Sequence, residues 1–323
     1  MLHAYVGIDV AKLTLWAHLS LEGGRCWSRE FANTEEGIGQ LIRWIAGHAP
    51  GAQARVCLEA TGTLGRLPSR AFASEGFDVR LMNPAQARDL ARGLGILDKS
   101  DRVDARVLAR CAELGLGREG AVPSKIKERL QDISRRIDSL TVQRAAEKTR
   151  LKNPSIAEEA KESLRRHIAF LTGEIEALEA LWKSIAQSCD EIHERFCLLK
   201  TVAGIGDKTA RVLTSELPQE LSPRKAAGYA GLAPRERSSG TSLRARERIR
   251  GGNPRVRKAL FLAAGILIRL DIDARSLHDR LLEAGKDHRL ALIAVANKLA
   301  RWVAAVLTRK TPWIPTQQVL DNS

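Results

Sequence analysis

Four acidic residues in the first third of the chain stand where carboxylates could build a metal site. Asp9 lies within the apolar run of residues 6–10, and Glu59 ends a second apolar run. A carboxylate in such a strand is costly to desolvate unless it gains a cation or another partner. Asp101 and Asp104 are three residues apart on a predicted helix, so both project from the same face. Carboxylates from two strands and one helix could bind a pair of Mg²⁺ ions and activate an oxygen nucleophile for attack on phosphorus.

Each of these carboxylates also has a purely structural interpretation. Asp101 could cap its helix or oppose the helix dipole, and Asp98 competes for that role. Glu59 could form a salt bridge with Arg55 or Arg66. For any one residue alone the structural interpretation is favoured. Taken together, in this order and on these elements, the four residues favour a metal site.

A second candidate for chemistry lies far downstream, in a loop rich in hydroxyl groups and arginine. Residues 231–242 read Gly-Leu-Ala-Pro-Arg-Glu-Arg-Ser-Ser-Gly-Thr-Ser, and further arginines follow. Hydroxyls among arginines that can clamp a phosphate suit a nucleophile for covalent phosphoryl transfer. Such a nucleophile needs a base or a metal, which the carboxylates could supply. The same hydroxyls could instead only bind phosphate, and local chemistry does not distinguish among Ser238, Ser239, Thr241 and Ser242.

The basic charge of the chain is concentrated around that loop. The chain has 52 Lys and Arg against 38 Asp and Glu, a formal net charge of +14. Residues 222–258 alone hold 11 basic and 2 acidic side chains. A surplus of this kind favours a polyanionic partner, either nucleic acid or an acidic membrane surface, and its one-sided density favours nucleic acid. The arginines that we expect to contact nucleic acid are Arg235, Arg237, Arg244, Arg246, Arg248 and Arg250.

The composition argues against a membrane protein or a secreted one. The longest apolar run, residues 259–268, is about half the length of a membrane span. The N-terminus lacks the basic start and apolar core of a signal peptide. The five cysteines are scattered, without zinc spacing or a disulfide pattern. We therefore expect a cytoplasmic protein with no membrane contact.

The elements that must position the four carboxylates have the pattern of a layered α/β domain. Residues 5–19 are apolar and β-branched enough for a strand that turns into a second one. Residues 56–59 and 77–82 are further strand candidates, the latter stopped by an Asn-Pro pair. Residues 103–114 have helical spacing. Strands that alternate with helices predict an α/β fold for this third of the chain.

The middle of the chain is predicted to be helical. Residues 126–140 carry apolar side chains at alternating steps of 4 and 3, and Asn153-Pro154 then interrupts the pattern. A longer series with the same alternation is typical of a coiled-coil seam, and its members are Leu164, Ile168, Leu171, Ile175, Leu178, Trp182, Ile185, Cys189, Ile192 and Phe196. The seam could fold back on residues 126–140 as an intramolecular hairpin, or it could be a self-association arm. Its regularity leans towards self-association.

The last third is also predicted to be mostly helical, and it begins with a glycine-containing turn. Residues 201–210 are typical of the turn of a helix-hairpin-helix element. Gly204 and Gly206 would let backbone N–H groups approach a phosphate closely, with Lys208 at the start of the next helix. A plain connection between two helices would have a similar sequence. Its place just before the basic segment favours contact with nucleic acid.

These segments together resemble the transposases of the insertion-sequence 110 family, relatives of the pilin-gene invertases. The resemblance covers nearly the whole chain, and its specificity comes from the order and spacing of the pieces. The matching stretches are residues 5–12, 59–63, 83–84, 99–106, 204–206, 231–234 and 239–240. In two places the chain departs from the family pattern: Leu64 replaces a common aromatic residue, and Ser238 adds a hydroxyl next to the serine position.

The resemblance implies three parts of the chain. The first, residues 1–150, would be similar to the RuvC resolvase, with a ribonuclease H-like fold and a DEDD site of Asp9, Glu59, Asp101 and Asp104. Residues 155–198 would form a coiled coil, and residues 199–318 a mainly helical C-terminal transposase domain. In that domain the family's nucleophilic serine precedes a glycine, which selects Ser239 before Gly240. Family members act on donor and target double-stranded DNA as homo-oligomers, dimers or tetramers, and several are guided by a structured bridge RNA.

The combined expectation is a DNA transposase that uses Mg²⁺ at the four carboxylates and Ser239 as the attacking group. The product of the attack would be a covalent serine–DNA ester that conserves bond energy for strand exchange. Because the two sites are far apart in sequence, they must meet within one chain or across a dimer, and the coiled coil favours the dimer. The alternative is a hydrolytic nuclease or Holliday-junction resolvase that uses the carboxylates alone.

Overall fold

The computed structural model describes residues 3–59, 62–119, 122–235, 238–239, 243–244, 248–249 and 251–315. For Glu119 and for the short strands between residues 234 and 249, the description covers the backbone. The chain folds into two compact units, Met1–Pro123 and Ser124–Ser323. The first unit holds the four predicted carboxylates, and the second holds the predicted serine.

A six-stranded mixed sheet forms the centre of the first unit, in the order β3-β2-β1-β4-β5-β6. The first three strands are antiparallel neighbours, β4 and β5 run parallel to β1, and β6 is a short antiparallel addition. This is the strand order of a ribonuclease H-like fold, which confirms the predicted class. The strands are β1 (His3–Val10), β2 (Thr14–Leu21), β3 (Cys26–Ala32), β4 (Gln53–Glu59), β5 (Asp78–Met82) and β6 (Arg118–Glu119).

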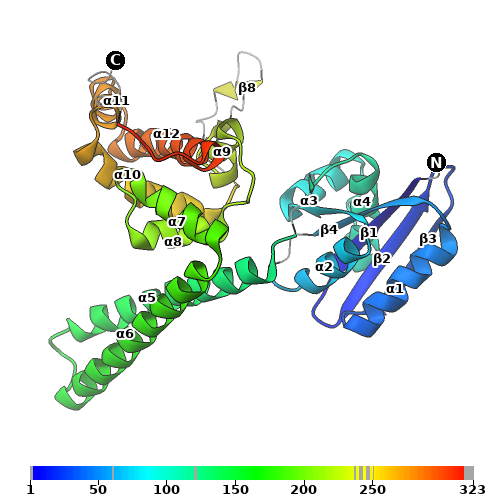
Figure 1. The fold of residues 1–323 in the computed structure, drawn as a ribbon, viewed down its shortest axis with the longest axis horizontal. Helices are drawn as coiled ribbons and strands as arrows, with labels where there is room; N and C mark the ends of the chain where they lie inside the picture. Colours follow the sequence, from blue (N-terminus) through cyan, green and yellow to red (C-terminus); the bar gives the residue numbers. More distant parts are fainter. Residues whose placement is uncertain are drawn as a thin grey trace. The chain divides into compact units, whose positions relative to one another are not determined.

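Helices cover both faces of this sheet, as Figure 1 shows. On one face, apolar residues of β1, β2 and β4 pack against Ile38, Leu41 and Ile45 of α1 and against Phe72 of α2. On the other face, Cys57 of β4 packs against residues of α3 and α4. The helices are α1 (Glu35–His48), α2 (Arg66–Ser74), α3 (Pro84–Gly93) and α4 (Asp101–Glu113).

Helix α4 lies unusually close to β1 because the strand has a glycine at the contact. A Cβ atom at Gly7 would be 2.0 Å from the backbone oxygen of Ala105 and 2.1 Å from the backbone nitrogen of Ala109. Only a residue without a side chain permits this approach. The glycine thereby fixes how far the first turn of α4 lies from the end of β1.

The second unit is mainly helical, as predicted. Its helices are α5 (Lys125–Leu151), α6 (Glu158–Gln187), α7 (Asp190–Thr201), α8 (Asp207–Glu216), α9 (Pro223–Ala230), α10 (Pro254–Leu270), α11 (Ile272–Glu283) and α12 (His288–Arg309). Between α9 and α10 lie four two-residue strands, β7 (Pro234–Arg235), β8 (Ser238–Ser239), β9 (Leu243–Arg244) and β10 (Arg248–Ile249). Buried residues of α5 through α12 join in one hydrophobic core.

The predicted coiled-coil seam is used within the chain. Leu171, Ile175 and Trp182 of α6 are buried in the same core as apolar residues of α5, so the two helices form the intramolecular hairpin. The seam is also not one continuous helix, because α6 ends at Gln187 and α7 begins at Asp190. Since α5 packs with α6 and α8, the first compact unit ends at Pro123, ahead of the expected boundary at residue 150.

Among the described residues, one helix is long and apolar enough to cross a membrane by length and composition, and that helix is α12. Half of its most apolar window is buried inside the second unit. Val295, Leu299 and Val303 are 0–2% exposed and belong to the main hydrophobic core. The apolar composition of α12 is therefore accounted for by its central place in that core.

A methyl group added at Gly7 should destabilise the first unit. We expect Gly7→Ala to lower the free energy of unfolding by about 1–3 kcal/mol, because the backbone of α4 would have to move away from β1. Amide hydrogen exchange of β1 measures this loss within the unit itself. Gly47→Ala is the matched control, since a Cβ at Gly47 in α1 would meet no atom within 4 Å. Equal exchange rates in Gly7→Ala and wild type would contradict the close packing.

Candidate active site

Asp9 and Glu59 lie side by side on one face of the sheet. The parallel register of β1 and β4 pairs Gly7 with Cys57 and Ile8 with Leu58, so the next step places Asp9 beside Glu59. Successive side chains of a strand alternate between faces. Asp9 and Glu59 therefore share the face of Gly7 and Cys57, which is the face that α4 covers.

Helix α4 brings the other two carboxylates to the same face. Its N-cap is Ser100, whose side-chain oxygen accepts a hydrogen bond of 3.3 Å from the backbone N–H of Val103. Capping by Ser100 leaves Asp101 and Asp104 in the first turn, free of that role. Because Gly7 sets α4 directly on β1, this first turn lies near the end of β1 that carries Asp9. The structure thus places all four predicted carboxylates around one region of the first unit.

The electrostatics of this region show that the four carboxylates act on one another. Burial and the negative charges of Asp101, Glu59 and Asp104 raise the pKa of Asp9 from its ordinary 3.8 to about 6. Burial and the charge of Asp104 also raise the pKa of Glu59, while Lys99 opposes that rise. Carboxylates that disfavour each other's ionisation are stabilised by a cation placed between them. The donor set of four carboxylate groups fits a hard divalent ion.

The four side chains are gathered but are not already in ligand geometry. Among the described residues, no group of three or more His, Cys, Asp or Glu side chains is arranged to hold an ion. One contact that spacing alone could not reveal is Arg88 of α3, whose Nη1 lies 4.0 Å from Oδ1 of Asp104. Arg88 also donates to the backbone oxygens of Leu97 and Asp98, each at 3.4 Å. Its guanidinium therefore connects the loop before α4 to the carboxylate cluster.

The predicted serine lies in a segment of short paired strands, residues 233–250, which we call the serine segment. Strand β7 pairs antiparallel with β10, and β8 pairs antiparallel with β9. In the second pair Ser239 stands opposite Leu243. The backbones of Arg235, Arg244 and Arg248 lie in β7, β9 and β10. Three further predicted nucleic-acid contacts lie outside the described residues, namely Arg237, Arg246 and Arg250.

The predicted helix-hairpin-helix element is present in outline. Helix α7 ends at Thr201 and α8 begins at Asp207, with the glycine-containing turn between them. Gly206 stands at the N-cap without a side-chain hydrogen bond, and Lys208 is exposed in the first turn of α8. Gly204 packs against α10. At the exposed start of α8, Asp207 forms an ion pair of 2.6 Å with Lys200, and Gly204 joins the turn to the core.

Comparison with known proteins gives matches over most of the chain. A profile described as a transposase, of the DEDD IS110 type, matches residues 6–154, and one described as transposase IS116/IS110/IS902 family matches residues 197–279. Two pilin gene-inverting proteins, from Moraxella bovis and Moraxella lacunata, are 30% and 29% identical over 97% of this chain and 98% of their own. A RuvC structure from Thermus thermophilus, 16% identical, is similar over 37% of this chain and 99% of that chain, with a TM-score of 0.27.

The first unit gathers four carboxylates on a mixed sheet, and the chain matches two transposase profiles. Together these findings define an enzyme that performs phosphoryl transfer on DNA. The DEDD class of domain implies the use of divalent metal ions, and the donor set at Asp9 fits that use. The chain belongs to the IS110 family of transposases.

The raised pKa of Asp9 predicts that acidity stabilises the first unit. Between about pH 4 and pH 6 the folded protein retains a proton on Asp9 that the unfolded chain has lost, so stability falls as the pH rises through this window. We expect Asp9→Asn to reduce the slope, leaving the part due to Glu59, and to be more stable than wild type at pH 7 by about 1–2 kcal/mol, after allowance for solvent screening. Urea denaturation at several pH values measures the effect. A wild-type slope retained in Asp9→Asn would contradict it.

Proposed function

We propose that this transposase recombines DNA through a covalent serine intermediate, with Ser239 as the nucleophile and a carboxylate-bound pair of Mg²⁺ ions. The four predicted carboxylates lie on one face of the sheet in the first unit, and this placement is the main support for the proposal. Gly7 makes it possible by letting α4 pack directly on β1. Burial and neighbouring carboxylates raise the pKa of both Asp9 and Glu59, which supports a cation among them.

The carboxylates would hold the metal and leave its other positions to DNA. Bound Mg²⁺ would polarise the scissile phosphate and favour a deprotonated nucleophile. Asp9 and Glu59 are held by the sheet, and Asp101 and Asp104 are held by the first turn of α4, so rotation of the side chains would bring the carboxylates onto the ions. Arg88, at 4.0 Å from Asp104, would orient that carboxylate in the same step.

The chemical step attributed to Ser239 is an ester exchange. The serine Oγ forms a bond to the scissile phosphorus, and the bond from that phosphorus to one sugar oxygen breaks. The serine proton passes to a base, and the departing sugar oxygen leaves as a hydroxyl after it gains a proton. No bond energy is lost to hydrolysis, so the reverse attack by another hydroxyl can rejoin strands. Ser239 and the carboxylates must meet within one chain or across a dimer, and we favour the dimer.

The second candidate function is a hydrolytic nuclease or Holliday-junction resolvase in which the carboxylates act alone. The names of the two relatives favour recombination over this alternative, since inverting a gene requires that cut strands be rejoined in a new orientation. A serine ester provides for rejoining, and hydrolysis does not. In the alternative, Ser239 would only bind phosphate.

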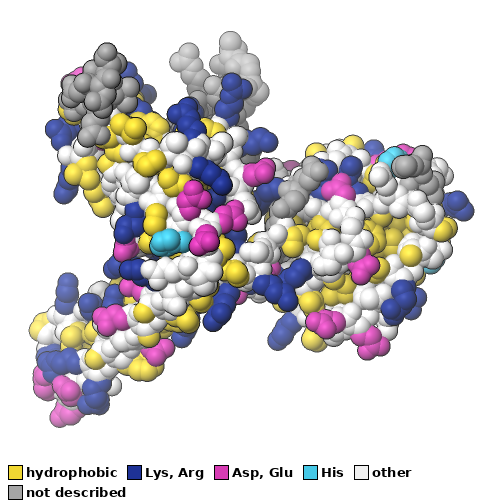
Figure 2. Space-filling view, in the orientation of Figure 1, with side chains coloured by type: hydrophobic (Ala, Val, Ile, Leu, Met, Phe, Trp, Pro, Cys, Tyr) yellow, Lys and Arg dark blue, Asp and Glu magenta, His cyan; other side chains and the backbone are white. Residues whose placement is uncertain are grey.

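The partners that we propose are donor and target double-stranded DNA, a structured guide RNA and further copies of the chain, all in the cytoplasm. The arginines of the serine segment and Lys208 on α8 supply positive charge for phosphate. Because the α6 seam is buried against α5, self-association would use other side chains of the hairpin. Phe170 and Val142 are 63% and 61% exposed there, and Figure 2 shows hydrophobic side chains among charged ones along this hairpin.

Two variants tested on a recombination plasmid separate these functions. We expect Ser239→Ala to abolish both recombination and the covalent protein–DNA adduct, because no other hydroxyl occupies the same position. Asp9→Asn should also abolish recombination, with DNA affinity unchanged within about twofold, because the metal site does not supply the phosphate-binding charge. Recombined plasmid and adduct are measured on denaturing gels.

Ser238→Ala is the matched control for this experiment and should retain recombination and the adduct. Strand cleavage that survives Ser239→Ala would favour the hydrolytic nuclease instead. Recombination that survives Asp9→Asn would overturn the role of the carboxylates.

Guidance by RNA has a separate test. Protein purified from cells that carry the element's flanking non-coding DNA should retain one structured RNA species, and recombination should require it. Sequencing the RNA that co-purifies measures this. With 2 Tyr and 6 Phe in the chain, there are few aromatic platforms for base stacking beyond the 6 Trp, so contacts from arginine to the RNA backbone should dominate and retention should weaken steeply with salt. Full recombination by RNA-free protein would refute guidance.

A further inference from the structure

The stretches of chain that flank the serine segment touch each other at three glycines, Gly231 on one side and Gly251 and Gly252 on the other. A Cβ at Gly231 would lie 2.1 Å from the backbone oxygen of Gly251, and a Cβ at Gly252 would lie 2.2 Å from the backbone nitrogen of Gly231. The chain therefore leaves α9 and returns to α10 through one closed neck. Beyond this neck, pairing of β7 with β10 continues the contact between the two ends.

One buried residue, Glu216 at the end of α8, contacts both sides of this neck. Its backbone oxygen accepts a hydrogen bond of 2.7 Å from the hydroxyl of Tyr229, in α9 before the neck. Its carboxylate Oε2 accepts one of 3.2 Å from Nδ2 of Asn253, which directly follows the neck. The backbone N–H of Asn253 donates in turn to the backbone oxygen of Tyr229 at 2.7 Å. These three residues close a ring of hydrogen bonds around the base of the serine segment.

Glu216 is itself held as a charged group inside the protein. Its side chain is 3% exposed, and Arg135 of α5 donates to both carboxylate oxygens, at 2.9 and 3.1 Å. Arg255 lies 3.8 Å from Oε1. Burial disfavours the carboxylate, but the hydrogen bonds from Arg135 hold its pKa below the usual range, so Glu216 is ionised. A buried charge with this many donors has a fixed orientation.

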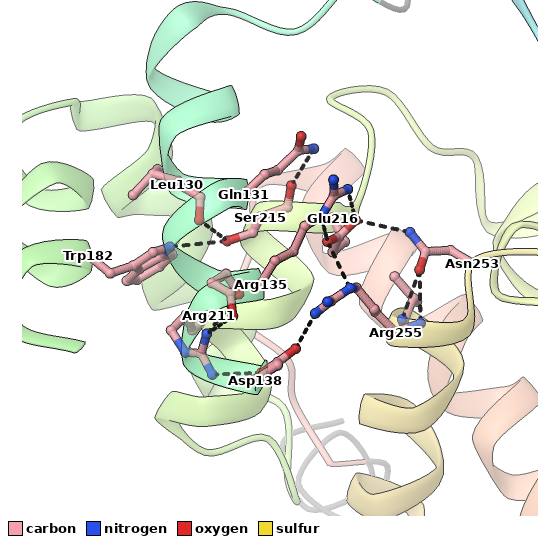
Figure 3. Close-up of polar contacts among 12 residues, drawn as sticks. Leu130, Gln131, Arg135, Asp138, Trp182, Arg211, Ser215, Glu216, Asn253 and Arg255 are labelled. Carbon is pink, nitrogen blue, oxygen red and sulfur yellow. Dashed lines mark hydrogen bonds and ion pairs between the residues drawn. The ribbon is translucent and has the colours of Figure 1, made fainter. Parts of the chain in front are cut away.

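The surrounding network ties this carboxylate to the framework of the second unit, as Figure 3 shows. Arg255 also pairs with Asp138 of α5, and Asp138 lies 3.3 Å from Nη2 of Arg211 in α8. Arg211 donates to the hydroxyl of Ser134 at 2.8 Å. Helices α5, α8 and α10 are thus cross-linked at the point where the serine segment leaves the core.

We propose that Glu216 and Asn253 are positioning residues for the recombination reaction, which anchor the base of the serine segment so that Ser239 is presented in a fixed orientation. This inference rests on the proposed role of Ser239. It requires neither residue to touch DNA. Anchoring the neck reduces the arrangements that the serine segment can adopt before reaction, and misplacement by about 1 Å is enough to slow an in-line attack severely.

Asn253 offers a substitution that separates anchoring from ordinary helix stability. Its Oδ1 accepts from the N–H groups of Arg255 and Val256 and so caps α10, while its Nδ2 makes the bond to Glu216. Asn253→Ser keeps a good capping oxygen and removes the amide donor. Asp287→Ser is the matched control, because Asp287 caps α12 in the same way, far along the chain from the serine segment.

At saturating DNA, we expect Asn253→Ser to slow single-turnover strand cleavage by about tenfold to a hundredfold. The DNA concentration that gives half the maximal rate should stay within about twofold of wild type, because no phosphate contact is removed. The backbone N–H at position 253 should be less protected from exchange than in wild type, relative to the intrinsic rate of each residue, in full-length protein without DNA. Asp287→Ser should change neither cleavage nor that exchange rate.

Several outcomes overturn the inference. Faster exchange at Asn253 with an unchanged cleavage rate would show that anchoring is not required, and an equal loss in Asp287→Ser would show a general effect of weaker capping. If Asn253→Ser does not fold, Tyr229→Phe removes the bond to Glu216 from the other side of the neck and should slow cleavage in the same direction. If wild type cleaves DNA without an adduct, the proposed role of Ser239 fails. Slower cleavage and faster exchange in Asn253→Ser than in wild type would even then show that the neck is anchored by these hydrogen bonds and that cleavage depends on it.

Discussion

The close contact between α4 and β1 is the constraint on which the candidate active site depends. Where Gly7 meets the backbone of Ala105, a helix lies against the central strand with no side chain between them. Burial of Asp9 and the negative charges that this contact draws together make the ionised form of Asp9 less favourable than in an unfolded chain. The fold therefore maintains a local electrostatic cost that a divalent cation would relieve. Bringing the carboxylates together lowers the stability of the metal-free fold and raises its affinity for a divalent cation. Gly7 sets how close they come, because it allows α4 to pack directly on β1.

The second unit also combines close backbone contacts at glycines with a carboxylate, but there the carboxylate is paired. Glycines 231 and 252 allow backbone to meet backbone, and a buried charge, Glu216, lies beside them. Here the charge is compensated by arginines, so the arrangement is rigid without any added ion. One unit thus has an acidic cluster in which the pKa values of Asp9 and Glu59 are raised, and the other has a buried acid, Glu216, whose pKa is lowered by its arginine partner. The cluster at Asp9 is suited to binding a cation, and Glu216 is suited to holding the base of the serine segment in place.

Much of the first unit could be predicted from its sequence, because β1, β2, β4, β5 and α4 have clear periodicity. Asp9 and Glu59 were found because acids inside apolar runs are conspicuous, and Asp101 and Asp104 were found because they stand three residues apart on a predicted helix. Other features had no local signal: α3 and its Arg88 reach Asp104 only through packing, and Glu216 and Asn253 meet across 37 positions of sequence. The coiled-coil seam was recognised, but periodicity does not say which helix covers it. The break at residues 188–189 likewise depends on how α7 turns onto the core.

The hairpin of α5 and α6 has a mechanical consequence. With 30 residues at about 1.5 Å of rise each, α6 is a rod of roughly 45 Å, and its apolar seam is already covered by α5. A rod that is complete within one chain loses little conformational entropy when something docks on it. On α5, its partner in the hairpin, Arg135 and Asp138 form ion pairs with Glu216 and Arg255. The helices of the hairpin and the base of the serine segment therefore share one network of ion pairs.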